Sequence, residues 1–473
     1  MLQTLKNAWK TKEIRSKILF TVFILLLYRI GTVIPVPFVD SNKISGTFSG
    51  TIFDYLNTLS GGSLGTATLF ALGVQPYINA SIIIQLLGVV FPNSIGTWAK
   101  EDKQKFNFLT RIVTVALALV TAIAYYFYLK NNNALTKAAT AGENSMFWLY
   151  GIAIVLCYCA GASIIMWLGE RINESGIGNG ISLILFANIV ASVPSFAINL
   201  TELVIGTYGY KNNSPVLYGI LSTLFAIVLV VAVVALLVLI IWVTGSERRI
   251  PIQYAKKVVG RKMYGGQSTN LPIKLNMTGV MPIIFASSIV SLVPTILQFA
   301  GVSESTKGGW GVVAKIFSTS GVLYPIALFA LIIAFAYFYT QITFDPNEVA
   351  NNLKRQGGAI PGIRQGKPTA DYIKKILGKV TLVGALFLGF IALLPSLAGP
   401  HLIKPLLEWF IKGAYTPELA KQYATSISNS ASQLSSVFTF GGTTLLIVVG
   451  VAIETFRELE AQLTMRNYKG FLN

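Results

Sequence analysis

Charged residues are scarce in this sequence. Only 12% of its 473 residues are Asp, Glu, Lys or Arg, whereas about 25% is typical of soluble domains. Hydrophobic residues make up 53% of the chain. A protein of this length cannot cover an aqueous surface with so few charges, which excludes a water-soluble fold. The composition predicts an integral membrane protein whose apolar surface faces lipid.

Metal-binding residues are also rare. The only cysteines are Cys157 and Cys159, two apart in an apolar run, where a helix would point their side chains in different directions. A disulfide between them is therefore not expected, and a zinc site would need more ligands than these two and His401, the only histidine. The apolar runs also contain no carboxylate pair and no base near a serine. We expect no catalytic residues, no metal site and no cofactor.

Long apolar runs dominate the chain. Ten of them approach the roughly 20 residues that cross a bilayer core of about 30 Å. The first follows a basic segment, residues 1–17, and lacks a small-residue cleavage site, so we interpret it as a retained span rather than a signal peptide. The predicted spans are Ile18–Ile34, Thr68–Phe91, Ile112–Leu129, Met146–Leu168, Ile181–Leu200, Val216–Val243, Leu275–Leu297, Gly321–Ile342, Ile376–Pro395 and Leu434–Ile453.

Lysine and arginine are distributed unevenly between the two sides of these spans. Alternate connecting segments, counted from the N-terminus, hold 27 of the 37 Lys and Arg, and the segments on the opposite side hold 9. Cytoplasmic segments of membrane proteins carry the excess of Lys and Arg, so both termini are expected in the cytoplasm. Apart from Lys379, which is counted with segment 343–379 at the start of the ninth span, Arg29 is the only formal charge inside the spans. We expect it to pair within the bundle or to reach the membrane surface.

Two cytoplasmic segments, residues 244–274 and 343–379, are too long to be simple connectors. Each carries 7 Lys and Arg among turn-forming glycines. A long basic loop of this kind can bind an acidic partner such as RNA or an ATPase.

A short internal repeat relates the two halves of the chain. Residues 73–81 (GVQPYINAS) and 279–287 (GVMPIIFAS) agree at six of nine positions with an offset of 206. They belong to the second and seventh spans, which are equivalent in two units of five. Because five is odd, the second unit starts on the opposite side of the membrane, so the repeats are inverted. Inverted repeats place their site at the repeat interface, near the membrane midplane.

Several longer segments resemble the SecY family of protein-secretion channels. They are FALGVQPYINASIIIQLL (70–87), GERINESGIGNGISLILF (169–186), QSTNLPIKLNMTGVMPIIFASSI (267–289), DPNEVANNLKRQGGAIPGIRQGKPTADYI (345–373) and FGGTTLLIVVG (440–450). The likeness runs from Tyr28 to Glu458. It implies an all-α polytopic membrane protein with ten transmembrane helices, in two inverted five-helix repeats around a central hourglass pore. The halves would be residues 18–205 and 206–453, followed by a cytoplasmic tail, residues 454–473.

The resemblance also implies a function. The family passes unfolded secretory polypeptides across the membrane and releases hydrophobic segments sideways into lipid through a lateral gate. A ring of aliphatic side chains suits such a channel, because it offers ions no ligands and closes around whatever passes. Ordinary core packing is the alternative interpretation of these residues. By match to the family, the ring comprises Val74, Ile78, Ile181, Leu185, Ile284 and Ile447.

Residues 53–65 match the short plug helix that fills the outer funnel of the family at rest. The segment is too short to span a membrane and contains glycines that permit a hinge. An external loop is the alternative interpretation. The implied plug residues are Phe53, Asp54, Tyr55, Leu56, Leu59, Gly61, Gly62 and Leu64. The lateral gate would lie between the second and third spans and the seventh and eighth, held closed by the polar residues Asn79, Gln85, Ser287 and Ser288.

The two basic loops match those by which the family binds the motor ATPase SecA and the ribosome. The implied contacts, including rRNA phosphates, come from Arg248, Arg249, Lys256, Lys257, Arg261, Lys262, Lys354, Arg355 and Arg364. Other implied partners are SecE-like and SecG-like small membrane subunits, secretory preproteins with their signal sequences, and membrane lipid. The implied location is the bacterial cytoplasmic (inner) membrane, with multiple passes.

Two other functions are alternatives to this one. A secondary transporter with inverted repeats would need buried charges and ion ligands at the interrupted helices, where this sequence has aliphatic residues. An accessory SecY paralogue for a narrow substrate set would differ in genetic dispensability rather than in sequence. The outer segments 131–147, 300–320 and 399–433 are long and give no interpretable signal.

Overall fold

The computed structural model describes residues 2–44, 52–92, 94–136, 147–209, 216–254, 257–259, 262–264, 268–302, 309–318, 321, 323–398, 405 and 442–465. Helices dominate this part of the chain, and one of them overlaps each predicted span. They are α2 (Lys12–Gly31), α4 (Gln75–Val90), α6 (Lys103–Asn131), α8 (Phe147–Ser175), α9 (Gly180–Gly209), α10 (Val216–Gly245), α11 (Met281–Phe299), α13 (Leu323–Thr343), α15 (Lys367–Ala398) and the last helix, residues 442–465.

Six helices in the described part of the chain are long and apolar enough to cross a membrane, by length and composition. They lie in α6, α8, α10, α11, α13 and α15. Two shorter apolar helices, Gln75–Val90 and Gly180–Pro194, accompany them. The membrane body is therefore helical and polytopic, as predicted, while the total of ten crossings stays a prediction.

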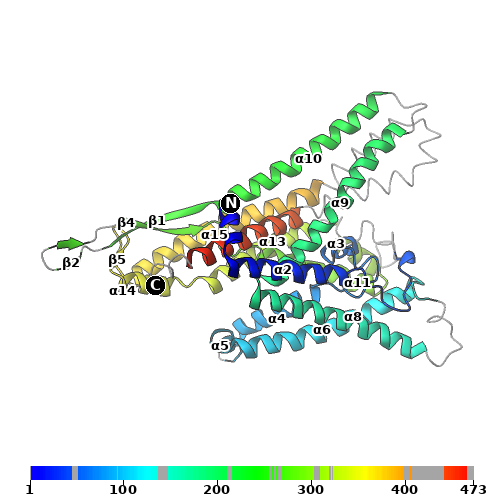
Figure 1. Cartoon of the computed structure of the whole chain (residues 1–473), viewed down its shortest axis with the longest axis horizontal. Coiled ribbons are helices and arrows are strands. Elements are labelled where there is room, and N and C mark those ends of the chain that lie inside the picture. The colour runs from blue at the N-terminus through cyan, green and yellow to red at the C-terminus, as the bar shows by residue number, and fades with distance from the viewer. Residues whose placement is uncertain are drawn as a thin grey trace.

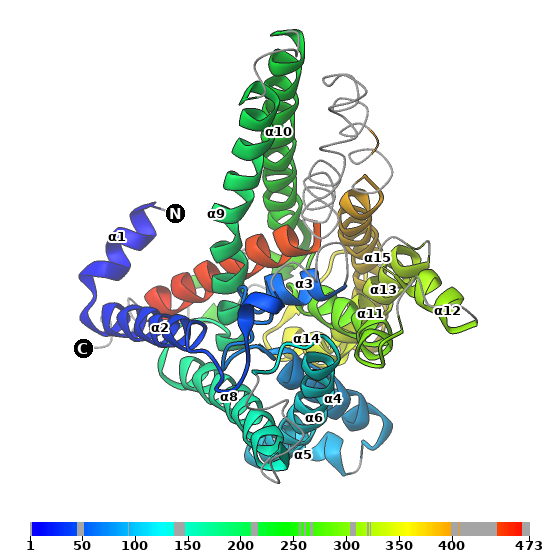
Figure 2. The same ribbon diagram turned by 90° about the vertical axis from the view of Figure 1, so that its right-hand side faces the viewer.

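The helices form two groups that meet around a short central helix. In one group α6 packs against both α4 and α8, and in the other α13 packs against both α11 and α15. The two groups touch where α4 contacts α11. Viewed along the bundle, the short helix α3 (Ile52–Leu59) lies in the middle, between α9 and α11 (Figure 2).

A lipid-facing surface is plain on α10. Val230, Val234, Val238 and Trp242 are all exposed along one side of this helix, which extends away from the rest of the bundle in Figures 1 and 2. An 18-residue stretch within Ala226–Gly245 of this helix has a mean hydropathy of 3.5. A surface of this kind is stable in lipid and unstable in water.

The sequence repeat has the same backbone geometry in both halves. Gly73 and Gly279 have φ of +57° and +65°, a left-handed conformation that L side chains avoid. The next residues, Val74 and Val280, cap α4 and α11 with nearly identical angles (φ −89°, ψ −8° and φ −92°, ψ −9°), and a proline follows in the first turn of each helix. The glycine ends the preceding turn and the proline starts the helix. This geometry supports the interpretation of residues 73–81 and 279–287 as a structural repeat.

The second span differs from its prediction. The sequence predicted Thr68–Phe91, whereas α4 begins at Gln75. Residues 68–74 instead form turns, and Thr68 makes an isolated β-bridge with Pro35. The reason is the left-handed Gly73, which a continuous helix cannot contain.

A charged contact ties α6 to α8. The Arg111 guanidinium donates two hydrogen bonds to the Glu170 carboxylate, from Nε to Oε1 at 2.9 Å and from Nη2 to Oε2 at 2.8 Å. Glu170 is largely buried, with 15% of its side chain exposed. The paired geometry fixes the relative position of the two helices.

The predicted loop 244–274 contains strands. β1 (Glu247–Tyr254) pairs antiparallel with β4 (Ser268–Lys274) and with β5 (Gly358–Ala359), and β2 (Lys257–Val259) pairs with β3 (Lys262–Tyr264). Ile250 and Ile252 of β1 are buried and alternate with exposed residues. This period of two is typical of a strand with one covered face. The sheet projects beyond the helices at one end of the molecule (Figure 1).

The helix α14 (Pro346–Arg355) covers the sheet and joins it to the bundle. A small hydrophobic core, separate from the main one, contains Ile250, Ile252 and Ile273 of the strands, Leu353 of α14 and Ile373 of α15. The two predicted loops, 244–274 and 343–379, therefore fold together into one unit. We call it the cytoplasmic extension, after the side of the membrane that the distribution of Lys and Arg predicts for it.

Candidate functional site

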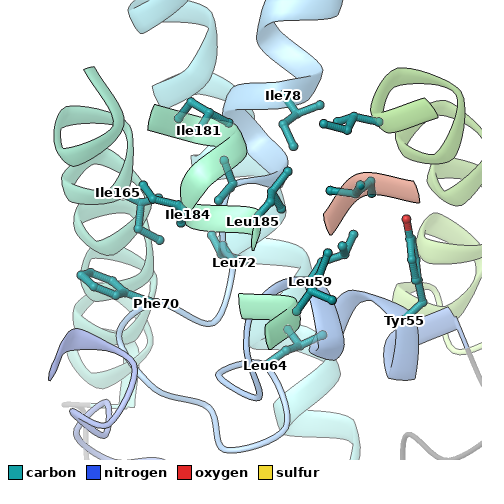
Figure 3. Packing of buried hydrophobic residues seen from close by; sticks show 14 of the residues in the cluster. Tyr55, Leu59, Leu64, Phe70, Leu72, Ile78, Ile165, Ile181, Ile184 and Leu185 are labelled. Atoms are coloured by element: carbon teal, nitrogen blue, oxygen red, sulfur yellow. The ribbon is translucent and has the colours of Figure 1, made fainter. Parts of the chain in front are cut away.

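The six residues of the predicted ring are all buried in one hydrophobic cluster. Val74, Ile78, Ile181, Leu185, Ile284 and Ile447 each expose 7% or less of their surface and belong to the main core. They come from four elements, the start of α4, the start of α9, the start of α11 and the last helix. Ile78 and Leu185 project toward the same central space, with Leu59 of α3 beyond it (Figure 3).

The predicted plug lies beside this cluster. α3 and the turns that follow it, residues 52–67, are called the plug segment below. Phe53, Tyr55, Leu59 and Leu64 are buried, and α3 packs against α9 and α11. Asp54, Leu56, Gly61 and Gly62 are half-buried. The segment is amphipathic and is enclosed by helices rather than by solvent, which disfavours the external-loop interpretation.

The plug segment is folded as one compact unit. The Asn57 side chain accepts from the Gly65 backbone N–H at 2.7 Å, and the Ser60 hydroxyl accepts from the Leu64 N–H at 3.1 Å. Gly61 and Gly62 have φ of +69° and +90° and make the turn that these bonds close. These contacts join α3 to the residues after it, so the segment has its own internal order.

Three side chains from helices α6, α8 and α9 donate hydrogen bonds to backbone carbonyls of the plug segment. Tyr125 of α6 donates to the Leu64 carbonyl at 2.7 Å, and Tyr158 of α8 donates to the Ala67 carbonyl at 3.4 Å. Asn188 of α9 donates to the Leu59 carbonyl at 2.7 Å. None of the three was predicted from the sequence. A tyrosine in an apolar span has the pattern of a core residue, whereas Asn188 is a polar residue in an apolar run and could have been singled out.

Arg29, the formal charge inside the first predicted span, bonds within the bundle, one of the two outcomes expected for it. Its Nη2 donates to the Ala187 carbonyl of α9. A Cβ added at Gly61 would lie 2.8 Å from Arg29 Nη1, so the guanidinium also borders the turn of the plug segment. The guanidinium therefore lies where a backbone carbonyl accepts a hydrogen bond from it.

Among the described residues, a side-chain hydrogen bond joins α4 of one helix group to α13 of the other. The Tyr339 hydroxyl of α13 donates to Oε1 of Gln85 on α4, and Gln85 Nε2 donates to Ser81 Oγ at 2.9 Å. Gln85 was predicted as a gate residue, whereas Tyr339 was not. The Tyr339 ring also packs on Phe285 of α11, with centroids 5.2 Å apart.

The other three predicted gate residues are placed differently. Ser287 donates to the Ile284 carbonyl of its own helix at 3.0 Å, and it also lies beside the Tyr55 hydroxyl of α3. Ser288 is buried in α11. Asn79 Oδ1 is buried without a hydrogen-bond partner among the described residues. Their part in a gate stays a prediction.

A small cavity of about 70 Å³ lies where the plug segment, α4 and α11 meet. Most of its lining is apolar, including Leu59, Leu185 and Phe299. Gln75 and Asn79 supply polar groups, and Gln75 Nε2 is also buried without a partner in the described part of the chain. Two ring residues, Val74 and Leu185, also line this cavity, so the space between the ring and the plug segment is not completely filled.

A much larger cleft, of about 1,430 Å³, opens below this junction on the side of the cytoplasmic extension. It separates α4 and α5 (Ile95–Glu101) from α13, α14 and the first half of α15. Gln85 and Thr340 lie on its walls. The cross-group bond of Gln85 therefore stands next to an open, water-accessible space.

The predicted docking cations gather on the cytoplasmic extension. Arg248, Arg249, Lys354, Arg355 and Arg364 are at least partly exposed there. Arg249 pairs with Glu247 at 2.7 Å. Lys256 and Arg261 lie outside the described residues, and for Lys257 and Lys262 only the backbone is described, in β2 and β3.

The last helix reaches the base of this extension. Arg457 Nη2 donates to the Thr244 carbonyl at 3.2 Å. Burial, and next the nearby charge of Arg457, lower the pKa of Lys274 at the end of β4. The extension is thus connected to the bundle through α15 and through the last helix.

Comparison with known proteins places the chain in a family. A model of the SecY family matches residues 68–456. Protein translocase subunit SecY of Streptomyces galbus is 38% identical over 483 residues, and that of Mycobacterium tuberculosis is 37% identical over 487 residues; both alignments cover 100% of each chain.

Solved structures agree on the fold. A structure described as a protein conducting channel has a TM-score of 0.58 at 18% identity, covering 94% of this chain and 92% of the other. A structure of SecY concerned with its plug domain has a TM-score of 0.59 at 19% identity, with the same coverage. The family match over most of the sequence, the full-length relatives and the shared fold lead to one conclusion. The chain belongs to the SecY family of protein translocase subunits.

Proposed function

We propose that the six ring residues are the seal of a channel through which unfolded secretory polypeptides cross the membrane. One observation carries this proposal. Ile78 and Ile284, which are equivalent in the repeat, are buried in the same hydrophobic core, and the plug residues Phe53, Tyr55 and Leu59 belong to that core too. A dry aliphatic constriction excludes ions because it offers them no ligands. It can also widen around a polypeptide of any sequence, because its contacts are not directional.

The lateral gate in this proposal is the contact between α4 and the pair α11 and α13. The Gln85–Tyr339 bond supports it, because this bond is the described side-chain hydrogen bond that joins α4 to α13. The apolar rings of Phe285 and Tyr339 pack within the second group and would move with it. A signal sequence that enters between the groups gains about 0.8 kcal/mol for each methylene it buries in lipid. One apolar helix therefore outweighs a few gate hydrogen bonds.

The plug segment closes the channel on the outer side of the ring. In one structural neighbour, a SecY protein, the plug domain is described as stabilising the closed state of the translocation channel and maintaining a membrane seal. The burial of α3 between α9 and α11 supports the same role here.

The cytoplasmic extension is the proposed docking surface for a SecA motor ATPase and for the ribosome. Its cations, Arg248, Arg355 and Arg364 among them, suit acidic or phosphate-bearing partners. One neighbouring structure is Sec61 in a ribosome-channel complex. SecE-like and SecG-like subunits complete the proposed assembly in the bacterial cytoplasmic membrane. Both termini face the cytoplasm in this proposal, as the distribution of Lys and Arg predicts. The chain supplies the passage, and the motor supplies the energy.

Site-specific crosslinking tests the seal. In a background with Cys157→Ser and Cys159→Ser, a single cysteine at position 78 or 284 should crosslink to a secretory precursor stalled during transport. Val230, which is 46% exposed on the lipid-facing side of α10, is the control position and should give no crosslink. A transport-competent protein that crosslinks at neither ring position would show that the ring is assigned wrongly.

A further inference from the structure

The plug segment of this chain is held through its main chain. Its carbonyls at Leu59, Leu64 and Ala67 each accept a hydrogen bond from a different spanning helix. We propose that the three donors, Tyr125, Tyr158 and Asn188, form a latch that sets how readily the plug is displaced; the inference rests on the proposed channel function. We call these three residues the plug latch.

Tyr125 is the centre of the plug latch. It is completely buried, and its ring packs on Tyr158 at 5.2 Å and on Phe299 of α11 at 6.4 Å between centroids. The hydroxyl has little freedom, because these rings hold the side chain in place. The bond to the Leu64 carbonyl is buried. A buried backbone acceptor needs a hydrogen-bond partner. The Tyr125 hydroxyl and the Leu64 carbonyl can therefore hydrogen-bond to each other only when the plug is in place.

Asn188 holds the other end of the plug segment. Its amide nitrogen donates both to the Leu59 carbonyl and to the Tyr28 hydroxyl of α2, at 2.7 and 2.8 Å. Tyr28 and Asn188 are both fully buried. The amide is thus oriented by a spanning helix before it contacts the plug. Both described bonds use the amide nitrogen, whereas Oδ1 is buried without a hydrogen-bond partner among the described residues. A polar group buried at this cost indicates a positioning role rather than a packing role.

We expect the plug segment to move as a single unit. The bonds of Asn57 to Gly65 and of Ser60 to Leu64 lie within the segment, and they need not break when it leaves. The plug latch bonds, in contrast, join the segment to α6, α8 and α9 and must all break. These bonds therefore add to the apolar packing of α3 against α9 and α11 in holding the closed state, while the internal bonds determine the shape of the plug.

The helix α6 provides a matched control. Tyr126 follows Tyr125 directly, but it is only half-buried, and its hydroxyl would lie 3.0 Å from a Cβ added at Gly151 of α8. Tyr125→Phe and Tyr126→Phe remove the same hydroxyl from neighbouring positions on one helix. Only the first removes a hydrogen bond that the structure describes to the plug segment.

The test uses the full chain reconstituted in vesicles with its SecE-like and SecG-like subunits. Resting permeability to a small anion is measured without SecA or substrate. A cysteine at Leu56, in the background without Cys157 and Cys159, reports on plug position through its reaction with an impermeant thiol reagent. Preprotein transport is measured on the same preparations. Asn188→Ala is a second variant that acts at the other end of the segment, in case Tyr125→Phe folds poorly.

The expected result is a rise of roughly tenfold in resting permeability and in Leu56→Cys labelling for Tyr125→Phe, as expected for one lost buried hydrogen bond. Asn188→Ala should behave in the same way, Tyr126→Phe should match the parent, and transport should persist in all of them. If both latch variants match Tyr126→Phe while preproteins are transported, the latch is wrong and the channel function stands. If the parent protein transports no preprotein with any motor, the channel function itself fails, and the latch fails with it.

Discussion

Removing the Tyr339 hydroxyl should loosen the gate without disturbing its packing. Tyr339→Phe retains the ring contacts with Phe285 and Phe338, whose centroids lie 5.2 and 5.7 Å away. It removes the hydrogen bond to Gln85 and leaves the Gln85 oxygen without that donor. Loss of such a bond costs about 1 to 2 kcal/mol. The ratio of open to closed gates should therefore rise roughly 5- to 30-fold.

The free-energy cost of the lost hydrogen bond can be compared with the free energy that signal sequences of graded hydrophobicity gain on entering lipid. One or two methylenes in a signal sequence are worth about 0.8 kcal/mol each when buried in lipid, which matches the bond that is lost. Tyr339→Phe should consequently restore export of a precursor whose signal sequence has been shortened by one or two methylenes. The assay is transport of a series of such precursors into vesicles, with the rate plotted against signal hydrophobicity.

Tyr337 supplies the control for this experiment. Its hydroxyl donates to the Gly378 carbonyl of α15 at 3.1 Å, a contact inside one helix group rather than between two. Tyr337→Phe should leave the dependence on signal hydrophobicity unchanged. Equal rescue by both variants would refute the assignment of Gln85 and Tyr339 as the gate contact, and so would no rescue by Tyr339→Phe in a protein that is otherwise active.

Four further substitutions test other parts of the structure. Gly73→Ala and Gly279→Ala should each destabilise the protein by about 1 to 2 kcal/mol, because both positions need a left-handed backbone; thermal unfolding in detergent measures this. Arg111→Lys should cost about 1 kcal/mol in the same assay, since lysine cannot make both bonds to Glu170. Ile284→Ala should raise the resting ion leak and destabilise the protein by roughly 2 to 5 kcal/mol, because it opens a cavity in the ring.

Each type of substitution has a control substitution of the same kind elsewhere in the chain. Gly245→Ala adds a methyl group to a position with no neighbouring atom within 4 Å, so it should be tolerated. Arg171→Lys changes an exposed pair within one helix, with Glu174, and should have little effect. Ile296→Ala alters a side chain that is 62% exposed on α11 and should not raise the leak. If the counterparts are as damaging as the changes themselves, the structural explanations are wrong.

The sequence alone predicted the helical membrane body, because long apolar runs leave few other folds possible. It also predicted the equivalence of Ile78 and Ile284, since a repeat of glycine and proline is visible without structure. It missed the start of α4, because Gly73 lies inside an apolar run and only its backbone angle shows that the helix has not begun. It missed the strands of the cytoplasmic extension, where the short alternation of Ile250 and Ile252 is hidden among cations.

The candidate site was predicted less completely than the fold. The ring residues are aliphatic and could be identified by family resemblance, and all six are buried together. The hydrogen-bonding partners could not be identified, because Tyr125 and Tyr339 are tyrosines in apolar helices and carry no pattern that separates a donor from a packed ring. Only the three-dimensional structure shows which carbonyl or amide each hydroxyl reaches.

The bonds to Leu59, Leu64 and Ala67 have a consequence for how this protein changes over generations. All three use main-chain carbonyls, which every amino acid possesses. Substitutions among the side chains of the plug can therefore accumulate while the anchoring points persist, provided that the backbone keeps its path. Selection should act instead on the donors in the surrounding helices. Plug segments whose sequences differ between related proteins can therefore be held by the same hydrogen bonds. A plug segment transferred from one relative to another should still bind in the channel if its backbone turns are the same.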